Sequence, residues 1–183
     1  MILKLLEKSQ KEKSIIGIWV YGDDEGFWSG YVKSFTEEIV VLQHFTKYGK
    51  PDGLIIEKIE NIESIDFEDD YVRAMEYLVQ NSSKLGQDIT TNITISSPKT
   101  WQKDILKQQL GKVDQVVKIQ VNSDSVYTGL VEDCDEENVV LRILGQEGED
   151  KGKALFRIQD ISSIRNNDMD SRKRLLLYNW RKK

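Results

Sequence analysis

"GYVKSFTEEIVVL" (residues 30–42) returns in altered form as "GLVEDCDEENVVL" (residues 129–141), 99 positions later in the chain. Each stretch begins with glycine, has valine two positions on, passes through a polar turn containing Glu-Glu, and ends in Val-Val-Leu. This shared order indicates an internal repeat in which each copy forms one structural unit.

The match continues downstream at the same spacing, through paired glycines and then isoleucines spaced by three. The matching pairs are Gly49 and Gly148, Gly53 and Gly152, Ile59 and Ile158, Ile62 and Ile161, and Ile65 and Ile164. We therefore predict a first unit over residues 1–80 and a second over 99–183. A Ser-, Thr- and Asn-rich linker, residues 81–98, is expected to join them.

Each copy has the period of two that is typical of half-buried strands. The clearest case is "VVKIQV" (residues 116–121), in which every second residue is aliphatic. A second strand passes through Gly30 or Gly129, where the missing side chain would let a bent strand close a small barrel. Further strands are expected at 39–45 and 138–144, at 54–59 and 154–158, and, after a tight helical turn, at the end of 59–65 and 158–164. The pattern predicts a mainly β chain of two five-stranded small barrels.

Helices are expected on both sides of each barrel. The first helices should cover residues 2 to about 11 and about 99 to 110, the second capped by Ser97 with Pro98 at its first position. The last helices should be capped by Asp69 or Asp70 and by Asp168. Their apolar stripes are predicted to pack on the barrels, through Tyr71, Val72, Met75, Leu78 and Val79 in one copy and Met169, Leu175, Leu176 and Trp180 in the other.

The composition fits a cytoplasmic protein without membrane contact. The 183 residues are 39% hydrophobic, enough for one ordinary core or two small ones. Residues 1–13 carry charges that interrupt any signal-peptide pattern, and no later stretch approaches a membrane-spanning length. Cys134 is the single cysteine, so an internal disulfide and a thiolate zinc cage are excluded.

The overall arrangement resembles the Sm-like family: a helix, then a bent five-stranded barrel with Gly-x-aliphatic in its second strand. Residues 30–43 are especially similar to the bacterial Hfq branch, with glycine, an aliphatic two on, a Ser-Phe pair, a polar turn and three aliphatics. The resemblance covers roughly residues 2–67 and 99–166. It implies a ring of barrels that binds single-stranded RNA at the turn after the second strand and between the fourth and fifth strands. An SH3-like barrel of another family stays open as an alternative.

The residues at these two implied RNA surfaces depart from the family pattern. The turn carries Glu-Glu in both copies where the Hfq branch has a polar amide and an aromatic, and carboxylates repel phosphate. The basic Lys-His pair before the last strand is replaced by Ile59-Glu60 and Ile158-Gln159. Asn138 can stand for an asparagine that some Sm proteins place against a base, although its twin is Ile39.

Aromatic residues crowd the first two strands of the first copy only. If Ile16, Ile18 and Val20 point inward, Trp19 and Tyr21 point outward, where the second copy has Gln120 and Asn122. Three interpretations are open: a protein interface, cover by a terminal helix, or a platform for stacking bases. The candidate ligand or interface residues are Trp19, Tyr21, Phe27, Tyr31 and Asn138.

Charge divides unevenly between the two copies. Residues 1–80 hold 9 basic and 16 acidic side chains, so residues 81–183 hold the other 17 basic and 15 acidic ones. A basic tail that includes Arg172, Arg174, Arg181 and Lys182 either complements a helix end or contacts nucleic acid.

No pattern of residues indicates catalysis. His44 is the single histidine and its twin is Ile143, which favours a structural imidazole. The acidic runs 23–25, 66–70 and 133–137 lack the spacing of a calcium loop and are interpreted as turns and helix caps. We expect no enzyme, no metal or cofactor, and no small-molecule substrate.

Two functions follow from the sequence. The first is a non-catalytic adaptor or assembly protein that binds a protein partner or itself, with ring formation through edge strands as in the Sm-like family. The alternative is a single-stranded RNA-binding protein that uses the aromatic strand residues or the basic tail.

Overall fold

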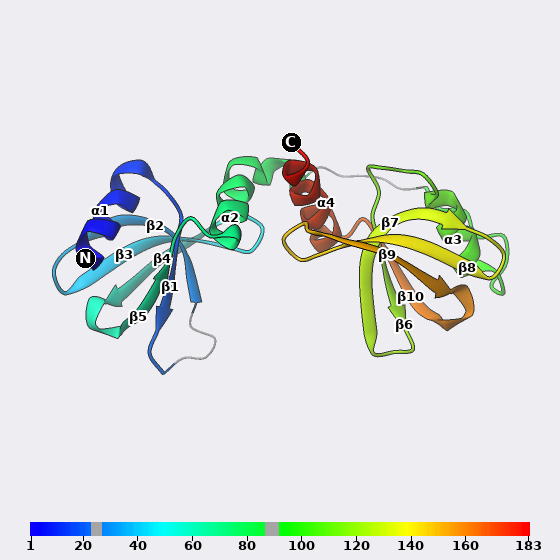
Figure 1. Cartoon of the computed structure of the whole chain (residues 1–183), viewed down its shortest axis with the longest axis horizontal. Helices are drawn as coiled ribbons and strands as arrows, with labels where there is room; N and C mark the ends of the chain where they lie inside the picture. The colour runs from blue at the N-terminus through cyan, green and yellow to red at the C-terminus, as the bar shows by residue number, and fades with distance from the viewer. Residues whose placement is uncertain (23–26, 87–91) are drawn as a thin grey trace. The chain divides into compact units, whose positions relative to one another are not determined.

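The computed structural model describes residues 1–22, 27–86 and 92–183. The chain divides into two compact units, Met1–Lys84 (unit 1) and Leu85–Lys183 (unit 2), which are shown in Figure 1 and described separately below. The acidic run 23–25 and part of the predicted linker, residues 87–91, lie outside the described residues.

Unit 1 contains one antiparallel sheet of five strands with a helix before it and a helix after it. Its elements are α1 (Ile2–Glu12), β1 (Ile16–Val20), β2 (Phe27–Phe35), β3 (Ile39–Phe45), β4 (Pro51–Lys58), the 3-10 turn η1 (Ile59–Asn61), β5 (Ile62–Asp66) and α2 (Asp70–Asn81). The 3-10 turn η2 (Ser82–Gly86) follows and includes the boundary between the two units. The strands lie in the order β4-β3-β2-β1-β5.

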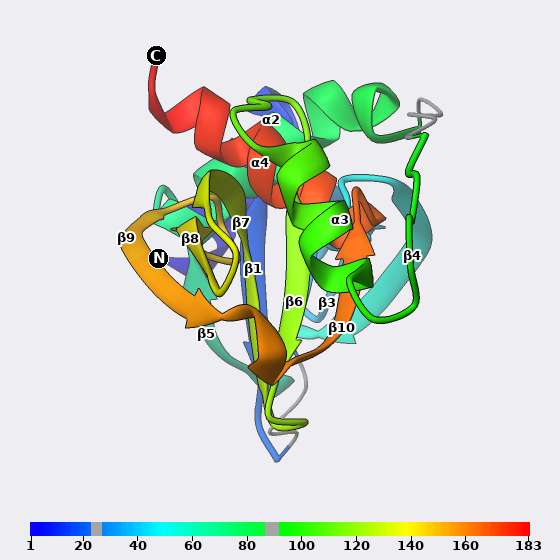
Figure 2. The same ribbon diagram turned by 90° about the vertical axis from the view of Figure 1, so that its right-hand side faces the viewer.

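Unit 2 repeats this plan. Its elements are α3 (Trp101–Gln109), β6 (Val117–Val121), β7 (Ser125–Cys134), β8 (Asn138–Leu144), β9 (Asp150–Arg157), η3 (Ile158–Asp160), β10 (Ile161–Asn166) and α4 (Met169–Arg181). The strand order β10-β6-β7-β8-β9 is that of unit 1 read from the other end. In Figure 2, α3 lies across the sheet of unit 2, where it contacts β7 and β10.

Within residues 1–22, 27–86 and 92–183, neither sheet is closed into a barrel. β4 and β5 are the two ends of the strand order in unit 1, as β9 and β10 are in unit 2. The prediction of a mainly β chain with two five-stranded units and flanking helices is confirmed at this level. Each sheet keeps two edge strands.

The two hydrophobic cores use matching positions. In unit 1 the core cluster consists of Leu6, Ile16, Ile18, Val32, Val40, Leu42 and Ile62. In unit 2 the equivalent residues are Leu106, Val117, Ile119, Val131, Val139, Leu141 and Ile161, joined by Ile158. The repeat in the sequence therefore corresponds to a repeat in the packing, and the alternating aliphatics point inward as predicted.

A glycine in the second strand of each unit permits a close approach of two backbones. A Cβ on Gly30 would collide with the carbonyl of Gln43 on β3, and a Cβ on Gly129 would collide with the carbonyl of Arg142 on β8. Any side chain at these positions would separate paired strands, because a backbone carbonyl cannot move aside as a flexible side chain can. The two glycines lie in equivalent surroundings.

A second glycine pair seats the last helix of each unit. Gly49 (φ 72°) and Gly148 (φ 77°) lie in the hairpin turns before β4 and β9. A Cβ on Gly49 would meet the backbone of Leu78 in α2, and one on Gly148 would meet that of Leu177 in α4. Each turn therefore rests directly on the helix backbone, which confirms that these helices pack on their own units.

Two of the predicted helix caps are present and one is wrong. Asp69 accepts a hydrogen bond from Val72 N at 2.7 Å, and Asp168 accepts one from Ser171 N at 2.8 Å. Ser97 does not cap α3, which begins at Trp101 after Thr100. Thr100 N instead donates to the Ser97 carbonyl at 3.1 Å, so residues 97–100 form a turn before the helix.

The predicted apolar stripe of α4 is only partly correct. Leu175 is buried, but Met169, Leu176 and Trp180 are half-buried. The buried apolar positions also include Leu177 and Tyr178, and Tyr178 packs with Leu175 against Val116 and Leu144. The helix is rotated relative to the sequence prediction because the turn at Gly148 contacts it at Leu177 and Tyr178.

Gly30→Ala is expected to lower the free energy of unfolding of unit 1 by about 2 kcal/mol or more, because the methyl group meets a backbone carbonyl. Gly86→Ala, at the end of η2 where the two units join, is the control for a glycine whose Cβ meets open space. Urea unfolding followed by circular dichroism measures both variants. Equal midpoints for the two would contradict the proposed constraint.

Candidate functional site

The main candidate site is an open depression in unit 2, with a volume of about 750 Å³. It lies where the start of α3, the β7–β8 turn and the end of β9 meet. We call it the unit-2 depression, and it is lined by Lys99, Thr100, Gln102, Lys103, Glu136, Glu137, Asn138, Arg157, Ile158 and Gln159. Nearly all of these side chains are charged or carry amides, which suits a polar ligand rather than an apolar one.

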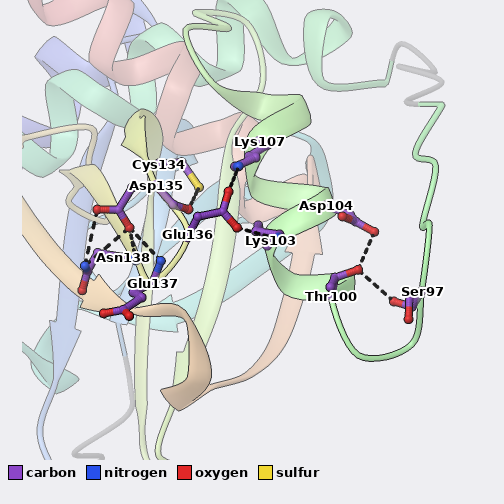
Figure 3. Close-up of polar contacts among 10 residues, drawn as sticks. All are labelled: Ser97, Thr100, Lys103, Asp104, Lys107, Cys134, Asp135, Glu136, Glu137 and Asn138. Carbon is purple, nitrogen blue, oxygen red and sulfur yellow. Dashed lines mark hydrogen bonds and ion pairs between the residues drawn. The ribbon is translucent and has the colours of Figure 1, made fainter.

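Glu136 is held by two lysines from α3. Its carboxylate lies 2.7 Å from Lys103 Nζ and 2.5 Å from Lys107 Nζ, as Figure 3 shows. Lys103 and Lys107 are four residues apart, so they point from the same side of the helix. Hydrogen bonds from these two ammonium groups lower the pKa of Glu136 to about 2. The carboxylate therefore stays ionised at neutral pH, and the two ammonium groups of the same unit offset its charge.

The β7–β8 turn is fixed by Asp135. Its carboxylate accepts hydrogen bonds from the backbone N–H groups of Glu137 at 2.7 Å and Asn138 at 2.6 Å. These bonds lower the pKa of Asp135. The Asn138 amide lies 3.5 Å from both carboxylate oxygens, so Asp135 also orients this side chain at the wall of the depression (Figure 3).

Unit 1 lacks the same chemistry at the equivalent place. With Leu6 set on Leu106, the positions of Lys103 and Lys107 are taken by Leu3 and Glu7. Asn138 is replaced by Ile39, which is 38% exposed. The depression is therefore a specialisation of unit 2.

Sequence reasoning placed Asn138 at this site but missed Lys99, Lys103 and Arg157. From the sequence, Glu136 and Glu137 were expected to repel phosphate, because nothing in it indicated that α3 lies beside the β7–β8 turn. The four-residue spacing of Lys103 and Lys107 was the available signal for two lysines on one side of the helix, but such spacing is common on exposed helices.

The predicted outward aromatics of unit 1 are found on the outer side of the sheet. Trp19 is 37% exposed and donates its indole N–H to Asp66 at 2.7 Å. Its ring centroid lies 4.6 Å from that of Phe27, which is 5.2 Å from Tyr71 of α2. Tyr21 is 65% exposed. The cluster is thus partly covered by α2, and Trp19 and Tyr21 reach solvent.

The structure separates other candidate aromatics from this cluster. Tyr31 lies 5.9 Å from Phe45, measured between ring centroids.

His44 packs edge-on against Trp28, and its Nδ1 lies 2.9 Å from the Ser29 carbonyl oxygen. These contacts give the imidazole a structural place in the sheet.

The basic tail is held largely by unit 2 itself. Arg174 donates to the Leu144 carbonyl at 3.2 Å, and Arg181 donates to the Glu147 carbonyl at 2.6 Å. Lys182 lies over the Tyr178 ring, 4.0 Å from its centroid, and Arg172 is half-buried. These contacts fasten α4 to the β8–β9 turn and favour a structural role for the tail.

The outer faces of the β3–β4 and β8–β9 hairpins differ sharply. In unit 2, Arg142 pairs with Glu132 and Asp150, and Lys153 pairs with Glu132. In unit 1 the exposed residues of this face include Ile39, Leu54 and Ile56. The unit-2 face thus carries an ion-paired cluster beside the exposed Leu155, whereas the matching unit-1 face exposes Leu54 and Ile56.

No group of three or more potential ligands that could hold a metal ion is found among the described residues. Within the same ranges, no helix is long and apolar enough to span a membrane. Burial raises the pKa of the half-buried Cys134 thiol, which therefore has little thiolate character at neutral pH.

No protein-family model, curated protein or solved structure matches this chain.

We predict that the Glu136 carboxyl titrates near pH 2 and that Lys103→Met/Lys107→Met returns its pKa toward 4.5. Because the folded pKa is depressed, the stabilisation from these ion pairs is complete above pH 4.5 and is lost as the pH falls toward 2. Carboxyl-carbon NMR titration measures the shift. Lys99→Met, which leaves both ion pairs in place, is the control, and a Glu136 pKa near 4.5 in the unmodified chain would refute the arrangement.

Proposed function

We propose that this chain is a non-catalytic assembly protein of the Sm-like kind, which contacts other protein chains through the open edges of its two sheets. In this proposal each unit is a small, strongly bent barrel that stays open between its fourth and fifth strands. The observation that carries it is that β4 and β9 are edge strands with exposed apolar side chains.

Several local features support the Sm-like assignment. Each unit has a helix before the first strand, a glycine at the closest approach of the second and third strands, and a 3-10 turn between the fourth and fifth. The strand order leaves the fourth and fifth strands as edges in both units. This is the arrangement expected if neighbouring chains pair edge to edge.

The edges themselves are suited to protein partners. Proteins usually protect long edge strands with charge, proline or a covering element, because the unpaired N–H and C=O groups are a template for another strand. On β4, Leu54 and Ile56 are 50% and 63% exposed, and on β9 Leu155 is 63% exposed. Such side chains gain free energy when a partner strand removes them from water.

The purified protein is expected to show a discrete mass above the 21.2 kDa of one chain in light scattering, with an absorbance ratio typical of protein alone. Ile56→Pro and Leu155→Pro each remove an outward N–H from an edge strand and should weaken association roughly tenfold or more. Ile56→Thr and Leu155→Thr keep the N–H and serve as controls for the lost side chain. An assembly unaffected by both prolines would argue against edge pairing.

A second candidate function is the binding of single-stranded RNA in the unit-2 depression. The specific observation in its favour is position: beside the start of α3, the depression includes the turn after the second strand and the segment between the fourth and fifth strands. These are the two segments that the resemblance links to RNA. Lys99 and Arg157 supply positive charge there, and Asn138 supplies a group able to pair with a base.

If RNA binds there, Arg157→Ala should weaken binding several-fold and reduce its salt dependence by about one unit in the log–log slope. Asn138→Ala should weaken binding with little change in that slope. Fluorescence anisotropy with a labelled single-stranded RNA measures both effects. Lys33→Ala, which changes an exposed basic residue of unit 1, is the control, and binding unchanged by both Arg157→Ala and Asn138→Ala would exclude the depression.

A further inference from the structure

β4 is the edge of unit 1 whose exposed side chains are apolar in the middle and charged at the ends. Leu54 and Ile56 are exposed, and the side chains of Asp52 and Lys58 are 61% and 66% exposed. β3 covers one side of the strand, and among the described residues no strand is paired with its other side.

The backbone direction of β4 follows from one hydrogen bond. Ile59 N donates to the Glu38 carbonyl at 2.9 Å, which continues the register that sets Ile39 against Lys58 and Val41 against Ile56. In an antiparallel ladder, hydrogen-bonded and non-hydrogen-bonded pairs alternate. Leu54, Ile56 and Lys58 therefore direct their N–H and C=O groups away from β3. In agreement, Lys58 N donates to the Glu57 side chain at 2.9 Å rather than to β3.

We propose that β4 pairs with β4 of a second copy of this chain, antiparallel across a two-fold axis at Ile55. Leu54 of each copy then lies opposite Ile56 of the other, and Asp52 lies near Lys58. Both outward-facing pairs exchange N–H···O=C bonds, and the exposed aliphatics cover each other. The contact is isologous, so it closes at two chains.

Side-chain matching selects this register from those that the backbone allows. From Leu54 to Lys58 the even-numbered residues face outward, so the ladder can move only in steps that keep them opposite one another. Centring it on Ile56 would set Leu54 against Lys58, and centring it on Leu54 would set Ile56 against Asp52. Both alternatives place an aliphatic side chain against a charged one, whereas the register centred on Ile55 pairs the aliphatics and brings Asp52 near Lys58.

Gly53 limits how far the ladder extends. Its φ of 80° and the register shift between Gln43 and Phe45 mark a bulge in β4. Regular pairing is therefore confined to Leu54–Ile56, and the attraction between Asp52 and Lys58 acts through their long or exposed side chains beyond it.

The equivalent strand of unit 2 excludes the same pairing. In β9 the twins of Asp52 and Lys58 are Lys151 and Arg157, and the twin of Leu54 is Lys153. The corresponding two-fold register would oppose Lys151 to Arg157 at both ends. Self-pairing is therefore a property of unit 1 and not of the repeated scaffold.

This inference rests on the proposed function and deepens it by naming the partner of one edge. The test is sedimentation equilibrium or light scattering of Asp52→Lys, Lys58→Glu and the double variant. Each single variant opposes like charges at both ends of the ladder and should weaken the dimer roughly tenfold at low salt. The double variant restores opposite charges and should regain most of the affinity.

An equimolar mixture of Asp52→Lys and Lys58→Glu chains gives a sharper result. At one end of the mixed ladder the two substituted positions meet with opposite charges, and at the other end the unchanged Lys58 meets the unchanged Asp52. A mixed dimer should therefore form where neither variant dimerises alone. Lys151→Glu, at the twin position on β9, is the matched control and should leave the β4 pairing unchanged. Circular dichroism checks that every variant is folded.

The outcomes separate this inference from the proposed function. An assembly that persists equally in both single variants, or an oligomer larger than a dimer that ignores these charges, overturns the β4 pairing and leaves edge-mediated assembly standing. A single chain at every concentration contradicts both.

Discussion

The backbones of the second and third strands approach each other so closely that only glycine fits between them, and this constraint underlies the rest of each unit. At Gly30 and Gly129 the facing carbonyl belongs to the matching residue, Gln43 or Arg142. The approach holds the second strand against the third, and the aliphatic residues of both then face one small core. Gly49 and Gly148 are constrained in the same way. Each lies in a turn that packs against the backbone of the last helix, and a side chain there would collide with that helix.

The sequence predicted the strands well because two signals agreed. Alternation gave each strand a buried side, and the repeat showed that the same positions were aliphatic twice, as at Ile18 and Ile119. It was less successful where tertiary contacts decide the outcome. Ser97 looked like a cap but closes a turn, and the buried side of α4 follows the turn at Gly148 rather than the spacing of leucines.

The candidate site was harder to predict than the fold, because its residues come from three segments distant in sequence. Asn138 was singled out, but Glu136 was interpreted as repulsive, since nothing in a linear pattern places Lys103 and Lys107 beside it. The aromatics show the same limit. Parity placed Trp19 outward, yet its hydrogen bond to Asp66 and its neighbour Phe27 depend on strands that meet only in the folded chain.

The outer faces of the two units can be compared within one chain, because one of them is ion-paired and the matching one is not. Arg142, Glu132, Asp150 and Lys153 occupy a scaffold whose core matches that of unit 1 position by position. The two cores thus keep matching residues, whereas the outer faces carry different ones. Exchanging the exposed residues of the two hairpins would exchange an ion-paired outer face for one without those ion pairs, while the core residues of both units stay the same.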